Sequence, residues 1–181
     1  THLQPGFYEI SGKTWGIIGL GAIGKQVAKI GLAMGAKIVY HSASGRNKTT
    51  EYPHLPLSEL LSCSDIISIH SPLNEFTKNL IGQKELAMCK PTAVFINVAR
   101  GGIVEELALA KAIENEQLGG VGIDVYSVEP ILPENPLLHL KNKEKLLLTP
   151  HIAWGSYEAR QKLMDITCRN IEEFLKSQKN G

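Results

Sequence analysis

The sequence lacks an excess of charge of either sign, and this absence removes two classes of binding partner. Nineteen lysines and arginines stand against 18 aspartates and glutamates, so the formal net charge is only +1. The basic residues are scattered, and no basic run with interleaved aromatic residues is present. Nucleic acids and anionic membranes attract proteins through concentrated positive charge. We therefore expect neither a nucleic acid nor a membrane as a partner.

Long hydrophobic runs are missing as well. The longest runs, residues 15–20 and 146–148, are far too short to cross a bilayer. Residues 1–5 contain neither the basic region nor the apolar region of a signal peptide. We therefore expect neither a transmembrane helix nor a secretory leader.

Cysteine is scarce, which limits both disulfides and metal sites. Cys63, Cys89 and Cys168 are far apart, odd in number and without metal-ligand spacing. Small secreted domains that depend on disulfides carry many paired cysteines. The cysteine usage therefore predicts a protein of the reducing cytoplasm that binds no metal.

What the sequence does contain is an alternation of two patterns. Short, β-rich apolar runs predict strands at residues 14–20, 37–41, 65–69, 93–98, 120–124 and 146–148. Helical periodicity predicts helices at residues 23–34, 57–61, 85–88, 105–116 and 158–176. The 43% hydrophobic content over 181 residues is enough for a buried core. Such alternation is typical of an α/β protein with a parallel sheet and helices on both faces.

The two ends of the chain lead to separate expectations. Residues 1–12 are polar and rich in turn residues, and we interpret them as the remnant of, or lead-in from, a preceding domain. Because the chain begins at Thr1 rather than Met, we interpret it as a fragment. Residues 13–181 are predicted to form one domain that includes the long C-terminal helix, with a buried apolar stripe on that helix. The stripe consists of Leu163, Ile166, Ile171, Phe174 and Leu175.

Three glycines with the spacing Gly-x-Gly-x-x-Gly follow the first predicted strand. Gly19 ends the strand and permits a tight turn, Gly21 lets the backbone approach a pyrophosphate, and Gly24 lets helix and strand pack closely. The helix that begins by Ala22 offers free N–H groups and the positive end of its dipole to an anion. The motif therefore predicts dinucleotide binding on a Rossmann-type doubly wound sheet.

The position that recognises the adenosine ribose comes at the end of the second strand. A carboxylate there would bind the ribose hydroxyls and repel a 2′-phosphate, but this chain has the neutral Ser42, with Arg46 and Lys48 soon after. This arrangement permits NADP without excluding NAD. A place in a solvated polar loop is nearly as good an interpretation of Arg46 as a phosphate contact.

Six stretches, in this order, resemble the NAD(P)-binding domain of the D-isomer-specific 2-hydroxyacid dehydrogenase family. They are the Gly-Leu-Gly-Ala-Ile-Gly of residues 19–24, His-Ser-Pro-Leu of 70–73 with Thr77, Asn-Val-Ala-Arg-Gly-Gly of 97–102, Gly-Ile-Asp-Val of 122–125, Glu-Pro of 129–130, and Thr-Pro-His-Ile-Ala-Trp of 149–154. The resemblance covers about residues 13–175. Members that act as hydroxypyruvate reductases or glycerate dehydrogenases look most similar.

The resemblance implies an oxidoreductase that transfers a hydride between NAD or NADP and a small D-2-hydroxy acid or 2-keto acid. It also implies a homodimer. Two departures from the family pattern are visible: Ser42 stands where the family has an acid, and the N-terminal substrate domain is absent. We therefore expect this chain alone to be poorly active.

By the same resemblance, three residues carry the catalysis. His151, after the last strand, is the acid/base, and an imidazole suits that role because it exchanges protons near neutral pH. Glu129 is the acidic partner that orients the imidazole. Arg100, at the end of the fourth strand, holds the substrate carboxylate in its guanidinium fork and polarises the neighbouring carbonyl.

The remaining expectations concern the cofactor. Asp124 would accept an N–H of the nicotinamide carboxamide, and Val98 and Ala99 would wall the ring. Ser71, Pro72 and Thr77 would flank the adenosine or pyrophosphate, although Thr77 could instead cap a helix. Trp154 could wall the substrate pocket or pack in the core. The full cofactor set is Gly19, Gly21, Ala22, Ile23, Gly24, Ser42, Arg46, Ser71, Pro72, Thr77, Val98, Ala99, Asp124, His151 and Ala153.

Two other functions remain open on the sequence alone. Corepressors related to this family use the same fold to sense NAD(H), and can keep the catalytic trio. Formate and phosphite dehydrogenases share the scaffold too, and residues of the substrate domain would separate them from hydroxyacid enzymes.

Overall fold

The computed structural model describes residues 8–45 and 49–179. The chain falls into two units, Thr1–Pro150 and His151–Gly181. Arg46 and Lys48, which the sequence placed near the ribose, lie outside the described residues.

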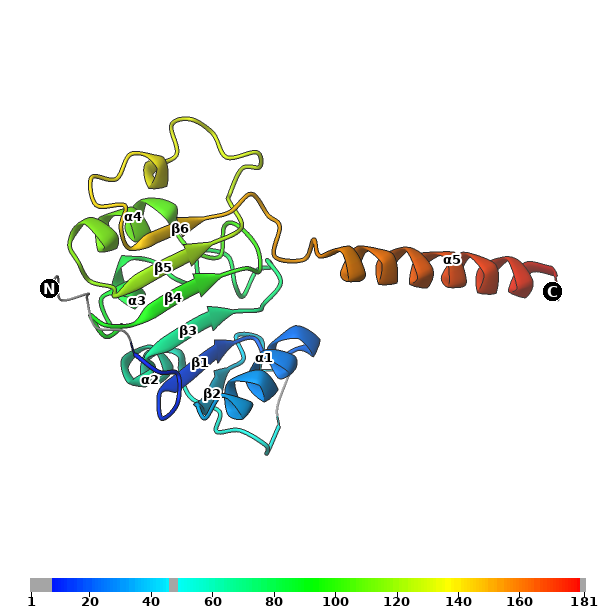
Figure 1. Cartoon of the computed structure of the whole chain (residues 1–181), viewed down its shortest axis with the longest axis horizontal. Helices are drawn as coiled ribbons and strands as arrows, with labels where there is room; N and C mark the ends of the chain where they lie inside the picture. The colour runs from blue at the N-terminus through cyan, green and yellow to red at the C-terminus, as the bar shows by residue number, and fades with distance from the viewer. Residues whose placement is uncertain (1–7, 46–48, 180–181) are drawn as a thin grey trace, which may run out of the picture. The chain divides into compact units, whose positions relative to one another are not determined.

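Among the described residues, six strands form one sheet in the first unit (Figure 1). From edge to edge the strands are β2 (Lys37–His41), β1 (Thr14–Ile18), β3 (Ile66–Ile69), β4 (Val94–Asn97), β5 (Gly120–Ile123) and β6 (Leu146–Leu148). Every neighbouring pair is parallel. The chain runs outward from β1 to β2 and then returns to β3 on the other side of β1. Ligands of doubly wound sheets bind at the carboxyl ends of the strands beside such a reversal.

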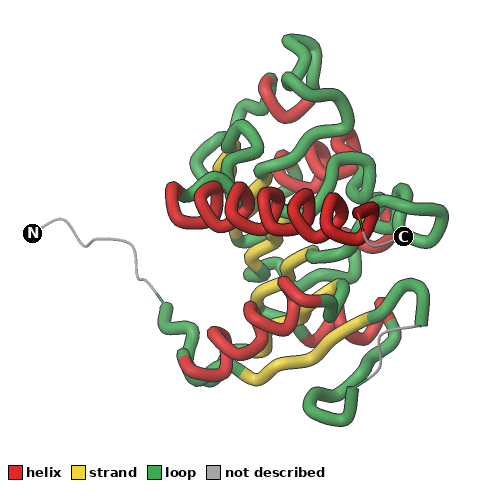
Figure 2. Tube along the Cα trace, turned by 90° about the vertical axis from the view of Figure 1, so that its right-hand side faces the viewer, coloured by secondary structure: helices red, strands yellow, loops and turns green. Residues whose placement is uncertain are grey.

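Helices connect the strands and lie on both faces of the sheet (Figures 1 and 2). They are α1 (Ala22–Ala33), α2 (Leu57–Cys63), α3 (Gln83–Leu86), α4 (Glu106–Glu114) and the 3-10 turn η1 (Pro136–Leu138). On the side of α1, however, the strands β4, β5 and β6 stay uncovered by the described residues of this unit, and Val94 and Leu147 are exposed there. Side chains alternate along each strand, so neighbouring residues of β1 enter different cores. Ile17 packs with α1, whereas Ile18 joins the larger core of α2, α3 and α4. The predicted Rossmann-type α/β fold is confirmed.

The second unit contains the long helix α5 (Tyr157–Lys179). The predicted buried stripe on this helix is wrong for this chain, because Leu163 is 54% exposed and the other four members are exposed too. A single helix has no second layer within its own unit against which a stripe can be buried. Trp154, 55% exposed, likewise does not pack in a core. Within the described residues, no helix combines the length and the apolarity needed to cross a membrane.

Candidate functional site

The glycine loop after β1 is packed so closely that two of its positions have no space for a side chain. Gly19 has a φ of +98°, and a Cβ there would collide with the Ser71 side chain and backbone. A Cβ at Gly24 would collide with the carbonyl oxygen of Gly19, so the first turn of α1 lies directly on the loop. At Gly21 a Cβ would meet nothing within 4 Å, so the space beside it is open. The loop therefore forms a backbone-lined cradle at the start of α1.

The N-terminus of α1 faces this cradle with its own N–H groups available. Gly21 is the N-cap, no side chain caps it in the described structure, and the first turn contains no acidic residue. The first helical hydrogen bond runs from the Lys25 N–H to the Gly21 carbonyl, 2.9 Å, so the N–H groups of the residues between have no helical partner. An anion such as a pyrophosphate fits a helix N-terminus that no side chain caps.

A hollow lies beside the cradle, between the end of β2 and the loop after β3; we call it the glycine-loop hollow. Its lining residues are Gly19, Gly21, Ser42, Ala43, Ser44, His70, Ser71, Pro72, Asn74, Glu75, Phe76 and Thr77. Ser42 is buried and follows β2 directly, where the ribose-recognition position was predicted. No carboxylate from the described end of β2 faces it, because residues 42–45 are Ser, Ala, Ser and Gly.

Thr77 holds the loop of residues 72–77 in shape. Its hydroxyl donates to the Pro72 carbonyl at 2.6 Å and accepts from the Asn74 N–H at 2.9 Å. The residue lies in a turn, so the helix-cap interpretation is wrong. Thr77 lines the hollow, but its hydroxyl makes its hydrogen bonds to Pro72 and Asn74 of its own loop, which follows Ser71 directly.

A second hollow adjoins the first; we call it the Arg100 hollow. Its lining residues are Ile23, His70, Ser71, Pro72, Val98, Ala99 and Arg100. Ile23, in the first turn of α1, is 68% exposed and presents an apolar side chain to this hollow. His70, Ser71 and Pro72 line both hollows, so together these form one continuous site along the carboxyl ends of β1, β3 and β4.

The loop that carries Arg100 is fixed by the buried side chain of Asn97, the last residue of β4. The Asn97 amide donates to the Arg100 carbonyl at 3.1 Å and accepts from the Ala99 N–H at 3.1 Å. The Arg100 guanidinium donates to the Ala99 carbonyl at 2.7 Å, which uses one of its five N–H donors. The exposed guanidinium therefore keeps further donors for a ligand at the mouth of the hollow.

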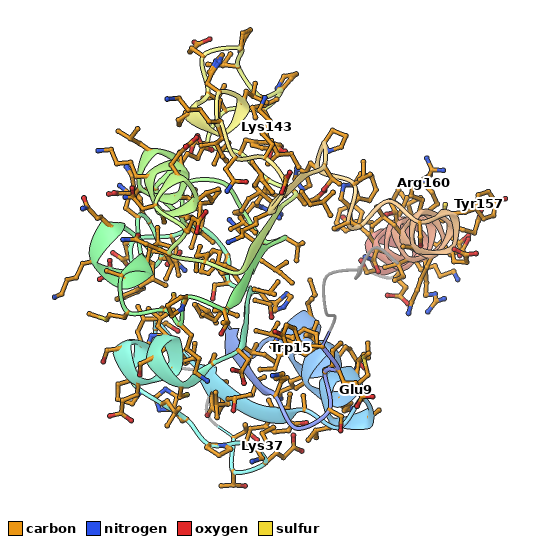
Figure 3. The ribbon with its side chains drawn as sticks, turned by 60° about the vertical axis from the view of Figure 1, so that its left-hand side comes forward. Glu9, Trp15, Lys37, Lys143, Tyr157 and Arg160 are labelled. Atoms are coloured by element: carbon orange, nitrogen blue, oxygen red, sulfur yellow. The ribbon has the colours of Figure 1, made fainter. Side chains whose placement is uncertain are left out.

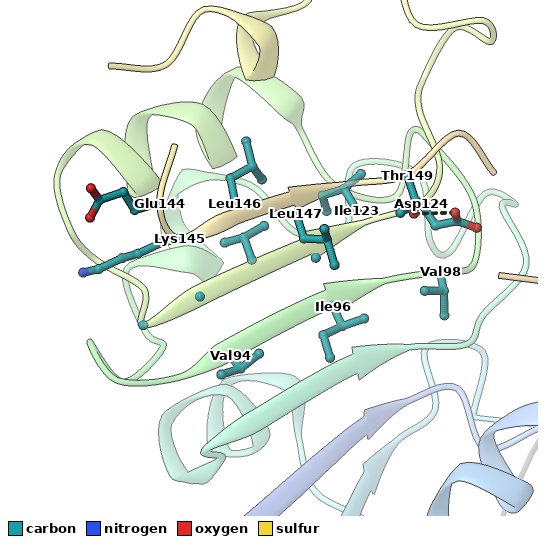
Figure 4. A pocket seen from close by; sticks show the side chains of 14 residues that line it. Val94, Ile96, Val98, Ile123, Asp124, Glu144, Lys145, Leu146, Leu147 and Thr149 are labelled. Carbon is teal, nitrogen blue, oxygen red and sulfur yellow. Dashed lines mark hydrogen bonds between the residues drawn. The ribbon is translucent and has the colours of Figure 1, made fainter. Parts of the chain in front are cut away.

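Asp124 is the buried acid at the end of β5. Its Oδ1 accepts from the Thr149 hydroxyl at 2.6 Å (Figure 4), and its backbone N–H donates to the Asn97 carbonyl at 3.0 Å. Val98, Asp124 and Thr149 line one end of a hollow over β4, β5 and β6. Asp124 is thus next to the strand that carries the Arg100 loop.

Glu129 accepts the Tyr126 N–H at 3.0 Å, in the exposed loop after β5. Burial, and after it the charges of Asp124, Glu106 and Glu129, raise the pKa of Tyr126. Three carboxylates contribute to this raised pKa, so the electrostatic environment of the loop is negative.

His151 and Ala153 belong to the second unit. His151 has a φ of +55°, in the left-handed region that non-glycine residues seldom adopt, and its carbonyl accepts the Trp154 indole N–H at 2.9 Å. Among the described residues, no group of three or more His, Cys, Asp or Glu side chains could hold a metal ion.

Residues 2–153 match the family described as D-isomer specific 2-hydroxyacid dehydrogenase, NAD binding domain. This chain belongs to that family. The fold, the glycine cradle and the family match together make it an NAD(P)-binding domain of the 2-hydroxyacid dehydrogenases, as the sequence motifs predicted.

Individual relatives agree with this assignment. A hydroxypyruvate reductase from Blautia hydrogenotrophica is 40% identical over 172 residues, which are 93% of this chain and 52% of the relative. The structure of an acyclic imino acid reductase, Bsp5, in complex with NADPH and D-Arg has a TM-score of 0.87 at 37% identity, covering 98% of this chain and 56% of that one. D-Lactate dehydrogenase from Aquifex aeolicus, complexed with NAD and lactic acid, has a TM-score of 0.86 at 28% identity, covering 97% and 58%. The chain spans about half the length of the curated relatives it matches.

His70 is a residue of this dehydrogenase domain that the sequence did not predict as part of the site. His70 lines both hollows, yet only its neighbours Ser71 and Pro72 were predicted to contact the cofactor. The available signal was its position, directly before Ser71 in the second family motif. A histidine after a buried strand has many structural explanations, so its position alone did not separate them.

Proposed function

We propose that this domain supplies the cofactor site and the catalytic residues of an enzyme that transfers a hydride between NAD or NADP and a small D-2-hydroxy acid or 2-keto acid. The observation that carries the proposal is the continuity of the two hollows, because a backbone cradle for a pyrophosphate and an arginine for a carboxylate share the walls Ser71 and Pro72. The names of the relatives, among them a hydroxypyruvate reductase, support a 2-keto acid as substrate.

Each of the proposed site residues would have a separate role in this reaction. Bound nicotinamide supplies the hydride donor or acceptor. Arg100 binds the substrate carboxylate and stabilises negative charge that develops on the neighbouring oxygen. His151 takes the hydroxyl proton during oxidation and returns it during reduction, and Glu129 favours the protonated imidazole. Asp124, Val98 and Ala99 orient the nicotinamide.

The test of this proposal is turnover of hydroxypyruvate, glyoxylate and pyruvate with each cofactor. We expect this chain to bind a dinucleotide but to turn over little, because an enclosed site that excludes water needs a second domain. A longer reading frame that contains the chain should be active on at least one of the three acids. Absence of turnover by that longer protein on all of them would contradict the proposal.

Arg100→Ala should damage both kcat and KM of the active protein. The loss of charge-assisted hydrogen bonds to the carboxylate and to the developing charge should lower kcat/KM by about 10²-fold or more. Arg100→Lys should recover only part of the lost kcat/KM, because lysine lacks the planar fork of the guanidinium group. Steady-state kinetics would show this split, with the Kd for the dinucleotide unchanged. A variant whose only defect is weaker dinucleotide binding would rule out the substrate role.

We further propose that the site accepts NADP, because Ser42 replaces an acid. Ser42→Asp should raise the Kd for NADPH about tenfold more than the Kd for NADH, since it places a negative charge against the 2′-phosphate. Calorimetric titration with each cofactor measures this difference. Ser62→Asp, which adds the same charge at an exposed position of α2 outside the hollow, is the matched control. Equal effects of Ser42→Asp on both cofactors would show that Ser42 is not at the ribose.

We also propose a homodimer in the cytoplasm. Ile30, in α1, and Met34, just after it, are exposed large apolar side chains four residues apart on one side of the helix, which supports a protein partner for this surface. The cysteines Cys63, Cys89 and Cys168 are all free thiols, which suits a reducing compartment.

A further inference from the structure

Three side chains, one on β1, one on β3 and one directly after β3, form a hydrogen-bonded chain that ends at the glycine-loop hollow and the Arg100 hollow. The indole N–H of Trp15, on β1 (labelled in Figure 3), donates to the Ser68 hydroxyl at 2.9 Å. The same hydroxyl lies 3.0 Å from Nε2 of His70. Ser68 is on β3, next to β1 in the sheet, and His70 is two residues further along, on the same face of the sheet.

The hydrogen atoms of this chain can be assigned from what each group is able to donate. An indole N–H only donates, so the Ser68 oxygen accepts from Trp15. Ser68 is 2% exposed, and a buried hydroxyl that leaves its own hydrogen unpaired loses stability. Within the described residues, the hydrogen-bond partners of this hydroxyl are Trp15 and His70. Ser68 therefore donates to Nε2, which must carry no proton.

The ring of His70 is neutral at physiological pH. Burial lowers the pKa of His70 to about 4, because the charged imidazolium would lose its hydration. A neutral imidazole carries one proton, and with Nε2 acting as acceptor this proton is on Nδ1. The chain from Trp15 through Ser68 thus selects one tautomer.

Nδ1 is accessible rather than enclosed. Within the described residues, Nδ1 has no hydrogen-bond partner. Every buried side-chain nitrogen or oxygen in that part of the chain does have a partner, so Nδ1 is not buried. His70 also lines both the glycine-loop hollow and the Arg100 hollow. Its N–H donor therefore belongs to the part of the surface where the two hollows meet.

We propose that the Nδ1–H of His70 donates a hydrogen bond to an oxygen at the centre of the bound dinucleotide, and that Trp15 and Ser68 hold this donor by fixing the tautomer. The inference rests on the proposed function, since a dinucleotide that lies along both hollows passes their junction with its pyrophosphate and its nicotinamide ribose. Both groups offer oxygen acceptors. His70 is then a cofactor-binding residue, and Ser68 and Trp15 are positioning residues.

Two amide variants separate the donor from the bulk of the side chain. His70→Asn places an amide nitrogen near the position of Nδ1, whereas His70→Gln places it near Nε2. We expect the His70→Asn variant to keep its Kd values for NADH and NADPH within about threefold of the wild type. The His70→Gln variant should have Kd values about tenfold higher, because it loses one hydrogen bond to a polar or charged acceptor. His54 is an exposed histidine outside both hollows, so His54→Gln is the control and should change neither Kd value.

Fragments of the cofactor identify the acceptor. If it is a pyrophosphate oxygen, His70→Gln weakens ADP but not AMP. If the acceptor is a ribose hydroxyl, His70→Gln weakens the binding of ADP-ribose but not that of ADP. Either result supports the proposal, and equal affinities of wild type, Asn and Gln for all ligands would overturn it. A wild-type chain that binds no dinucleotide would instead refute the proposed function.

Nuclear magnetic resonance reads the tautomer directly in the unliganded chain. At pH 7, long-range proton–nitrogen correlations of His70 should show a neutral ring protonated at Nδ1. Ser68→Ala should shift the ring toward a mixture of tautomers and raise the Kd for NADH a few-fold, with an unchanged circular dichroism spectrum. A wild-type ring protonated at Nε2 would overturn the inference, whatever the binding data show.

Discussion

His151→Ala should lower kcat of the active protein by about 10²–10⁴-fold, the usual contribution of general acid–base catalysis. The Kd for the dinucleotide should barely change, because the glycine cradle that holds it lies in the other unit of the chain. Rapid-mixing measurement of nicotinamide absorbance would separate the chemical step from cofactor binding.

The backbone at His151 gives this prediction a structural reason. It is one of three non-glycine residues with a positive φ among the described residues, and such conformations concentrate at functional sites. His139→Ala, in a loop where the ring contacts the Pro133 carbonyl, is the matched control and should leave kcat unchanged. A His151→Ala enzyme that keeps most of its turnover would remove His151 from the mechanism.

Gly24→Ala should destabilise the domain, whereas Gly21→Ala should not. The added Cβ at Gly24 meets the Gly19 carbonyl oxygen, a backbone atom that cannot move aside without opening the loop. Overpacking of this kind costs about 1–3 kcal/mol, which exceeds the gain of up to about 1 kcal/mol from replacing glycine by alanine inside a helix. Urea unfolding should therefore show a lower free energy of unfolding for Gly24→Ala.

Gly21→Ala separates binding from stability. A Cβ at Gly21 meets nothing within 4 Å and its φ is −80°, so the folded domain accepts alanine. The same methyl group would fill the space through which the backbone approaches the pyrophosphate, so the Kd for NADH should rise. If Gly21→Ala destabilised the domain as much as Gly24→Ala, the separate roles given to the two glycines would be wrong.

The sequence predicted the sheet well because parallel strands buried on both faces give short apolar runs with clear ends. The bounds of β2 and β6 agree with the prediction. The apolar run predicted a first strand that reaches residue 20, whereas the glycine motif predicted its end at Gly19. The strand ends at Ile18, because Gly19 takes a left-handed conformation that an extended strand does not allow. Such a conformation is available to glycine but cannot be read from its apolar neighbours.

Other parts of the account depended on contacts between distant residues, which a one-dimensional pattern does not contain. The stripe on α5 has the periodicity of a buried face, but periodicity does not say what covers it. The importance of His70 depends on Trp15, 55 positions earlier (70 − 15), through a register between β1 and β3 that only the fold supplies. The roles of Glu129 and His151 came from resemblance to the family, and they remain predictions.

Calorimetric titration of this chain with NADH and NADPH tests the central claim most directly, because the cradle, the open N-terminus of α1 and the continuous hollows all belong to its first unit. We predict saturable binding of one dinucleotide per chain, with weaker binding of AMP than of ADP. A chain that is folded by circular dichroism but binds neither dinucleotide would contradict the account.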